Sequence, residues 1–116
     1  MSRSVLLQLA RDSIAEVLEA QRTIDKIALT NEYPLLNEKI PTIVNIYIDD
    51  ELRGSSKTTD NSESLLEAII KNAKRCAFED KSFNPISTSE YLSCEIEILL
   101  TTPDGIISER DPSILE

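Results

Sequence analysis

The sequence predicts an α+β fold, in which an antiparallel or mixed β-sheet is flanked by helices within a single domain. Two long segments carry apolar residues at helical spacing, whereas other segments alternate or are rich in β-branched residues, and turn residues separate them. A chain of 116 residues is the usual size for one domain with one hydrophobic core. We therefore expect one domain over residues 1–116.

The first long helix is predicted from Ser4 to about Gln21. Its apolar residues recur at steps of three and four, and polar residues take the other side of the helix: Gln8, Arg11, Asp12 and Glu16. Residues 22–42 contain two prolines and no sustained period, so we expect a connection there. A short helix near 23–28 is left open.

A β-hairpin is predicted next. The segment TIVNIYID at 42–49 is dense in β-branched residues, three acids at 49–51 supply turn chemistry, and a second extended run follows at 52–59. Gly54 lies inside this second strand, where glycine costs stability and usually marks a bulge or a close approach of two backbones. The Arg53-Gly54 pair is therefore there for a reason other than strand propensity.

The second half of the chain predicts a helix, a short helical turn and a strand. SLLEAIIKNAKRCAFED at 64–80 has one apolar stripe, with Ser62 or Ser64 as its N-cap. Residues 87–90 have the S-x-x-E form of a capping box, and CEIEILLT at 94–101 alternates as a half-exposed strand does. Residues 103–105 signal a turn, after which a further strand is left open at 106–107.

Composition narrows the function classes. The net charge is −9, from 21 acids against 12 Lys and Arg, so nucleic acid and anionic membrane surfaces are disfavoured as partners. The chain has two cysteines and no histidine, which removes the usual zinc-site spacings. Charged residues interrupt the N-terminal apolar segment, so we expect neither a signal peptide nor a membrane span. A cytoplasmic protein without metal or cofactor is expected.

The acidic run Asp49-Asp50-Glu51 invites a metal-site interpretation. Adjacent strand residues point to opposite faces, and the run lacks the alternating ligands, central glycine and terminal glutamate of an EF-hand loop. We interpret it as the solvated tip of the hairpin. Cys76 and Cys94 fall on apolar faces and are expected to be buried, unreactive thiols.

Two other sets of residues are candidates for binding. Arg53, beside the predicted bulge, could present its guanidinium to a carboxylate or phosphate. Glu79 and Asp80 end a helix, where acids oppose the helix dipole, so they are expected to bond something. These two acids could act as a general acid or base, or they could form a salt bridge to Lys81 or Arg75, and the sequence does not decide between these roles.

Three segments together resemble the AMMECR domain family, whose bacterial and archaeal members are called AmmeMemoRadiSam system protein A. They are LLQLARDSIAEVLEA at 6–20, YIDDELRG at 47–54 and the run from SLLEA to PDGI at 64–106. Within the second, LRG at 52–54 is similar to the start of the family's L-R-G-C-I-G motif. Within the third, the run from Ala77 to Leu100 is similar to its A-F-x-D-x-R-F-x-P-L-S stretch and following strand. The resemblance implies an antiparallel sheet flanked by helices, a functional site at the L-R-G-C-I-G segment, and Memo-like or radical-SAM protein partners. No established reaction comes with it.

The sequence departs from the family pattern in two ways. Ser55-Ser56-Lys57 stands where the family has Cys-Ile-Gly, which removes the site's thiol. The chain also stops near 116, so we expect the C-terminal part of the family domain to be missing and its place to be taken by a homodimer or a protein partner.

We therefore expect a binding or accessory module, without enzymatic activity, that binds through a surface made of five residues: Arg53, Gly54, Ser55, Glu79 and Asp80. The alternative is an enzyme or enzyme subunit with a small-molecule cleft near Arg53. A structural remnant without a site is a third interpretation.

Overall fold

The computed structural model of the protein describes residues 4–58, 63–80 and 84–111. In chain order its elements are α1 (Val5–Glu19), α2 (Lys26–Glu32), the 3₁₀ helix η1 (Pro34–Asn37), β1 (Thr42–Ile48), β2 (Glu51–Thr58), α3 (Leu65–Phe78), α4 (Thr88–Ser93), β3 (Glu95–Thr102) and β4 (Gly105–Asp111). The strands form one sheet in the order β2-β1-β3-β4, and every neighbouring pair is antiparallel. The predicted α+β class is confirmed, in its antiparallel form.

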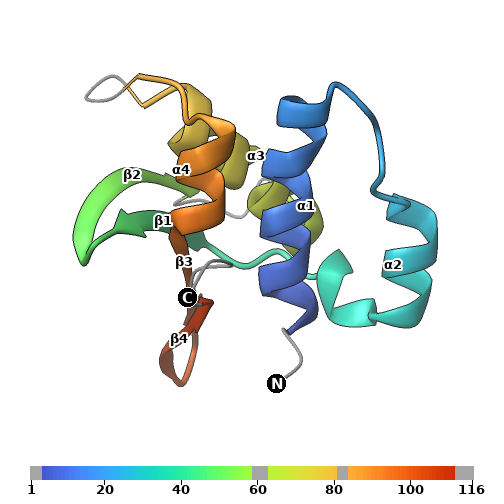
Figure 1. Ribbon diagram of the computed structural model, residues 1–116. Helices are drawn as coiled ribbons and strands as arrows, with labels where there is room; N and C mark the ends of the chain where they lie inside the picture. Colours follow the sequence, from blue (N-terminus) through green and yellow to red (C-terminus); the bar gives the residue numbers. More distant parts are fainter. Residues whose placement is uncertain (1–3, 59–62, 81–83, 112–116) are drawn as a thin grey trace.

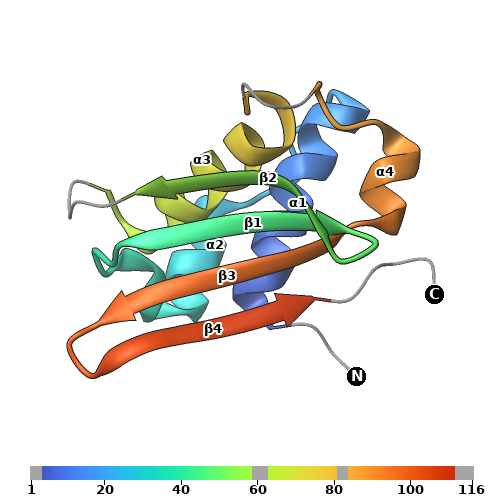
Figure 2. The same ribbon diagram turned by 90° about the vertical axis from the view of Figure 1, so that its left-hand side faces the viewer.

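The protein has two layers. Figure 2 shows the sheet in front and the helices behind it, and Figure 1 shows α1 and α3 side by side on the covered face. Alternate residues of β1 and β3 point into this interface, and the apolar stripes of α1 and α3 close it. The largest of the fully buried apolar side chains there are Leu9, Ile14, Val44, Ile46, Leu65, Ile69, Ile96 and Ile98.

Each of the helices α1 to α4 begins after a serine or an aspartate. The side-chain oxygen of that N-cap residue accepts a hydrogen bond from one of the first backbone N–H groups, which have no partner within the helix. Ser4 caps α1 and Ser64 caps α3, while Ser62, the alternative for α3, lies outside the described residues. The capping box between Ser87 and Glu90 is confirmed. Asp25 caps α2, so the short helix left open near 23–28 is present, and it begins at Lys26, inside that range, and extends to Glu32.

The β1–β2 hairpin is confirmed, with Asp49 and Asp50 as its two-residue turn. Both have positive φ, 52° and 65°, which is the signature that a type I′ hairpin turn requires. Both acids are exposed, as expected of a solvated tip. The strand left open after residue 105 is also present, as β4 at the edge of the sheet.

One expectation for α1 is wrong. Arg11 was expected on the polar side of the helix, but it is among the most buried side chains of the protein. Its Nε donates to Asp111 at 2.6 Å and its Nη2 to the carbonyl of Cys94 at 2.8 Å. Because its charge and donors are met by these groups, the guanidinium can lie in the core.

In the part of the chain that the structure describes, no helix is both long enough and apolar enough to cross a lipid bilayer.

Candidate functional site

A β-bulge in β2 presents Arg53. Ile46 of β1 pairs with Gly54, but the next residue, Tyr47, pairs with Leu52, so Arg53 is the extra residue of the bulge. A bulge re-aims the side chain of the residue that it inserts, which here turns Arg53 toward the start of α4. The bulge that the glycine predicted is confirmed, and it sets the direction of the candidate arginine.

The Arg53 guanidinium donates to the carboxylate of Glu90 through two of its nitrogens. Its Nε lies 2.9 Å from Oε2 of Glu90 and its Nη2 lies 3.3 Å from Oε1, while Nη2 also donates to the carbonyl of Asn84 at 2.6 Å. The arginine side chain is 13% exposed and the glutamate 36%. Arg53 thus pairs with a carboxylate of its own chain, and this pair links β2 to the N-terminal turn of α4.

The pKa of Glu90 is lowered from its ordinary value, first because Arg53 donates to its carboxylate. Partial burial opposes this effect, and the backbone N–H of Ser87 adds to it through the capping box. Glu90 is thus held ionised by two separate parts of the chain.

Gly54 provides the close backbone approach. A Cβ atom at this position would lie 2.0 Å from the carbonyl oxygen of Cys76 on α3. Any side chain would therefore collide with helix backbone, which cannot give way as a flexible side chain could. Gly54 is buried, so it shapes the site by setting the distance between strand and helix rather than by facing solvent.

Ser55 joins the strand to the end of α3. Its backbone N–H donates to Oδ2 of Asp80 at 3.0 Å, and its Oγ donates to Oδ1 of Asn45 at 2.6 Å. β2 is an edge strand, and a carboxylate on an outward N–H blocks pairing with another chain. The expectation that an acid at this helix end bonds something holds for Asp80.

Glu79 is the C-cap residue of α3 and is exposed. No ion pair joins it to Arg75 within the described residues, and Lys81, the other expected partner, lies outside them. The structure thus brings Arg53, Ser55 and Asp80 into one region where β2, the end of α3 and the start of α4 meet. Glu79 borders this region.

Sequence reasoning missed three members of this cluster: Asn45, Asn84 and Glu90. Glu90 had a signal as the glutamate of the capping box, but its bond to Arg53 spans 37 residues of sequence and has no local pattern. Asn45 lies on the open face of β1, where its amide also donates to Glu97 at 3.1 Å.

The described residues of the cluster around Arg53 and Ser55 include no activated nucleophile. Ser55 has no histidine to act as its base, since the chain contains none, and its hydroxyl is already bonded to Asn45. Both cysteines are buried, and burial is the main reason that the pKa of each thiol is raised. Among the described residues, no three acidic, cysteine or histidine side chains are grouped so as to hold a metal ion.

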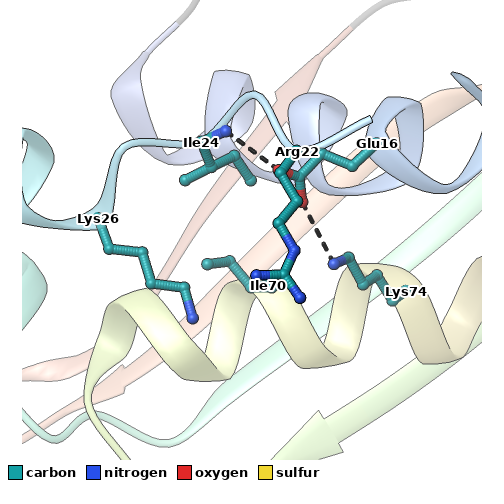
Figure 3. Close-up of a pocket in the computed structure, with 6 residues that line it drawn as sticks. All are labelled: Glu16, Arg22, Ile24, Lys26, Ile70 and Lys74. Atoms are coloured by element: carbon teal, nitrogen blue, oxygen red, sulfur yellow. Dashed lines mark hydrogen bonds and ion pairs between the residues drawn. The ribbon is translucent and has the colours of Figure 1, made fainter. Parts of the chain in front are cut away.

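A cavity of about 440 Å³ lies elsewhere, between the end of α1, the segment that follows it and α3. Figure 3 shows its six lining residues: Glu16, Arg22, Ile24, Lys26, Ile70 and Lys74. None of them was predicted as a site residue. Three of the six are cations, although the chain as a whole is acidic.

The comparisons with known proteins agree with this fold. A sequence model of the AMMECR1 family matches residues 7–114. Protein LS215_2104 and Protein M1425_1941, from two strains of Saccharolobus islandicus, are each 31% identical over 107 residues, which cover 87% of this chain and 45% of the relative. The uncharacterized protein PH0010 from Pyrococcus horikoshii has a crystal structure that matches with a TM-score of 0.74 and 29% identity, over 84% of this chain and 50% of that one. The chain thus spans about half the length of the curated relatives it matches.

Proposed function

The chain belongs to the AMMECR1 family, and from this premise we propose that it acts as a binding or accessory module without enzymatic activity. Its contact surface is the region where β2, the end of α3 and the start of α4 meet. Arg53, Gly54, Ser55, Glu79 and Asp80 belong to this contact surface. Arg53 and Gly54 build it, and Ser55, Glu79 and Asp80 face the partner.

One observation carries the proposal: Arg53 is bonded to Glu90 and Asn84, and the amide of Ser55 is bonded to Asp80. These bonds join three chain segments before any partner arrives. A preformed surface binds more tightly because little ordering entropy is lost on association. The same bonds occupy the arginine and the serine, which favours recognition over catalysis.

The proposed partner is a protein, of the Memo-like or radical-SAM class that the family resemblance implies. The exposed Glu79 and the overall charge of −9 suit a complementary basic patch on that partner. Electrostatic attraction of this kind raises the association rate and weakens with added salt.

The test is direct binding between the purified chain and a purified Memo-like or radical-SAM protein from the same organism, measured by calorimetry. The Glu79→Lys variant is expected to bind at least about tenfold more weakly, since it puts a like charge against the basic patch. Glu19→Lys is the matched control, because Glu19 is also an exposed acid at the end of a long helix. Equal loss in both variants, or no binding by the wild type, would count against the contact surface.

An enzyme is the second candidate, favoured by the adjacency of Arg53, Ser55 and Asp80. Its substrate would be a small anion in a cleft beside Arg53. Binding of anionic metabolites that disappears in Arg53→Ala, together with turnover that also disappears, would support this candidate over the binding module.

We also propose that the chain self-associates through β4. This strand lies at the sheet edge, and its Ile106 and Ile107 are 68% and 54% exposed. An exposed apolar edge strand readily pairs with another copy of itself. Light scattering should give twice the 13.0 kDa mass of one chain; a single-chain mass at high concentration would contradict this.

A further inference from the structure

In the cavity shown in Figure 3, hydrogen bonds hold the lining residue Glu16 in place. The Glu16 carboxylate accepts the backbone N–H groups of Thr23 and Ile24 at 2.7 and 3.0 Å and the ammonium of Lys74 at 3.3 Å. Burial raises the pKa of Glu16, but these donors together outweigh burial and lower it. Glu16 therefore stays ionised and fixes the segment after α1 against α3.

The cations of the cavity are unequally neutralised. Lys74 shares Glu16 with the two backbone amides, and Lys26 lies 3.0 Å from Glu67, in an exposed pair. Arg22 has neither an ion pair nor a hydrogen bond within the described residues. Since both oxygens of Glu16 are already engaged, the guanidinium is left with its donors available.

The local charge is opposite to that of the chain. Three cations and one carboxylate line the cavity, which leaves a net charge of +2 where the whole chain carries −9. Figure 3 shows the Arg22 guanidinium between the ammonium groups of Lys26 and Lys74, along α3. Glu16 and Glu67 each pair with one of the two lysines, so the positive charge that has no paired carboxylate among the described residues is that of Arg22, and it attracts an anion to this part of the cavity.

We propose that this cavity binds a small phosphorylated metabolite. A phosphate monoester carries a charge of roughly −1.5 to −2 at pH 7, which is opposite in sign to the net positive charge of the lining. The guanidinium of Arg22 offers a planar fork for two phosphate oxygens, and Lys26 and Lys74 add point charges. The volume of about 440 Å³ suits a small metabolite.

The carbon skeleton of the ligand lies on the apolar side chains of the cavity, Ile24 and Ile70. Ile70 is buried in α3 and Ile24 is half-buried in the segment after α1. Ligand sites commonly combine such an apolar floor with a few placed charges. This site shares no residue with the contact surface proposed for protein binding and does not rest on that function.

The test is an NMR titration of the ¹⁵N-labelled chain at constant ionic strength. The probes are inorganic phosphate, phenyl phosphate and malonate, a dianionic dicarboxylate. We expect saturable shifts at residues 22–26 and 70–74 with both phosphates, tighter binding of phenyl phosphate because of its apolar ring, and weaker binding of malonate. Arg22→Gln should weaken phosphate binding by at least about tenfold.

Arg22→Gln tests the site without endangering the fold, because Arg22 is exposed and bonds to no described residue. Arg75→Gln is the matched control, as an exposed arginine of α3 that does not line the cavity. Phosphate shifts scattered over surface lysines, equal binding by the wild type and Arg22→Gln, or malonate bound as tightly as phosphate would each overturn the proposal. Partner binding through Glu79 is measured separately and is unaffected by any of these results.

Discussion

Arg11 on α1 and Asp111 at the end of β4 form an ion pair inside the protein, with 2.6 Å between Nε and Oδ2. The guanidinium also donates to the carbonyls of Tyr91 and Cys94 and lies 5.4 Å from the centre of the Tyr91 ring. One side chain thus holds the first helix, the end of α4, the start of β3 and the last strand together.

Loss of Asp111 should destabilise the fold strongly. Asp111→Asn removes the carboxylate charge 2.6 Å from the buried guanidinium of Arg11, and breaking a buried ion pair costs about 3–5 kcal/mol in comparable cases. Urea unfolding at pH 7 measures the loss. Arg110→Gln is the control, because Arg110 pairs with Glu95 near the surface, and exposed pairs contribute about 0–1 kcal/mol. Similar losses in the two variants would contradict a special role for the buried pair.

Gly54 should tolerate no side chain. Gly54→Ala places a Cβ atom 2.0 Å from the carbonyl oxygen of Cys76, so β2 must move away from α3. Overpacking against backbone costs about 1–3 kcal/mol or more. Thermal unfolding should show a lower Tm for Gly54→Ala than for Ser55→Ala, which removes one exposed hydroxyl next to it. An unchanged Tm would mean that the strand and the helix are not in this contact.

The spacing of apolar residues along short segments of the sequence predicted most of the helices and strands. The stripes of α1 and α3 and the alternation of β3 each reflect burial of one face, which leaves a periodic trace in neighbouring residues. Gly54 was informative for a similar reason, since only a backbone constraint explains glycine inside a strand. Both the bulge and the close approach were therefore within reach of the sequence.

Long-range pairing left no such trace. The local pattern of α1 predicted that Arg11 lies on the surface, because its partner, Asp111, is 100 positions away in the sequence. Arg53 and Glu90 are 37 positions apart, and the cavity joins Arg22 to Lys74 across the packing of α1 on α3. The sequence does not tell whether a charged residue is buried or exposed when its partner is far away along the chain, so only the folded structure distinguishes the two cases.

Asn72 should fix the position of α3 on β2. It is fully buried, its Oδ1 accepts from Ser56 at 2.7 Å, and its Nδ2 donates to Thr58 at 2.8 Å. Asn72→Leu leaves both hydroxyls facing an apolar group, at a cost of about 1–3 kcal/mol. Hydrogen exchange should then be faster at the amides of β2 than at those of β3. Equal acceleration in both strands would indicate general destabilisation instead.

The pair between Arg53 and Glu90 should make stability depend on pH. The pKa of Glu90 is lower in the folded protein than in the unfolded chain, first because Arg53 donates to it. The bond therefore contributes fully above the unfolded value, near 4.5, and is lost as pH falls through the lower folded value. The free energy of unfolding should fall across this window in the wild type and fall less in Arg53→Gln.

Urea titrations at several pH values between 3 and 7 measure this difference. Arg75→Gln removes an equally positive but exposed arginine of α3, so its profile should have the slope of the wild type. If Arg53→Gln and the wild type lose stability in parallel below pH 5, Glu90 is not held by Arg53 in solution. The support that we assign to the contact surface would then be absent, because the bulge of β2 would no longer be joined to α4.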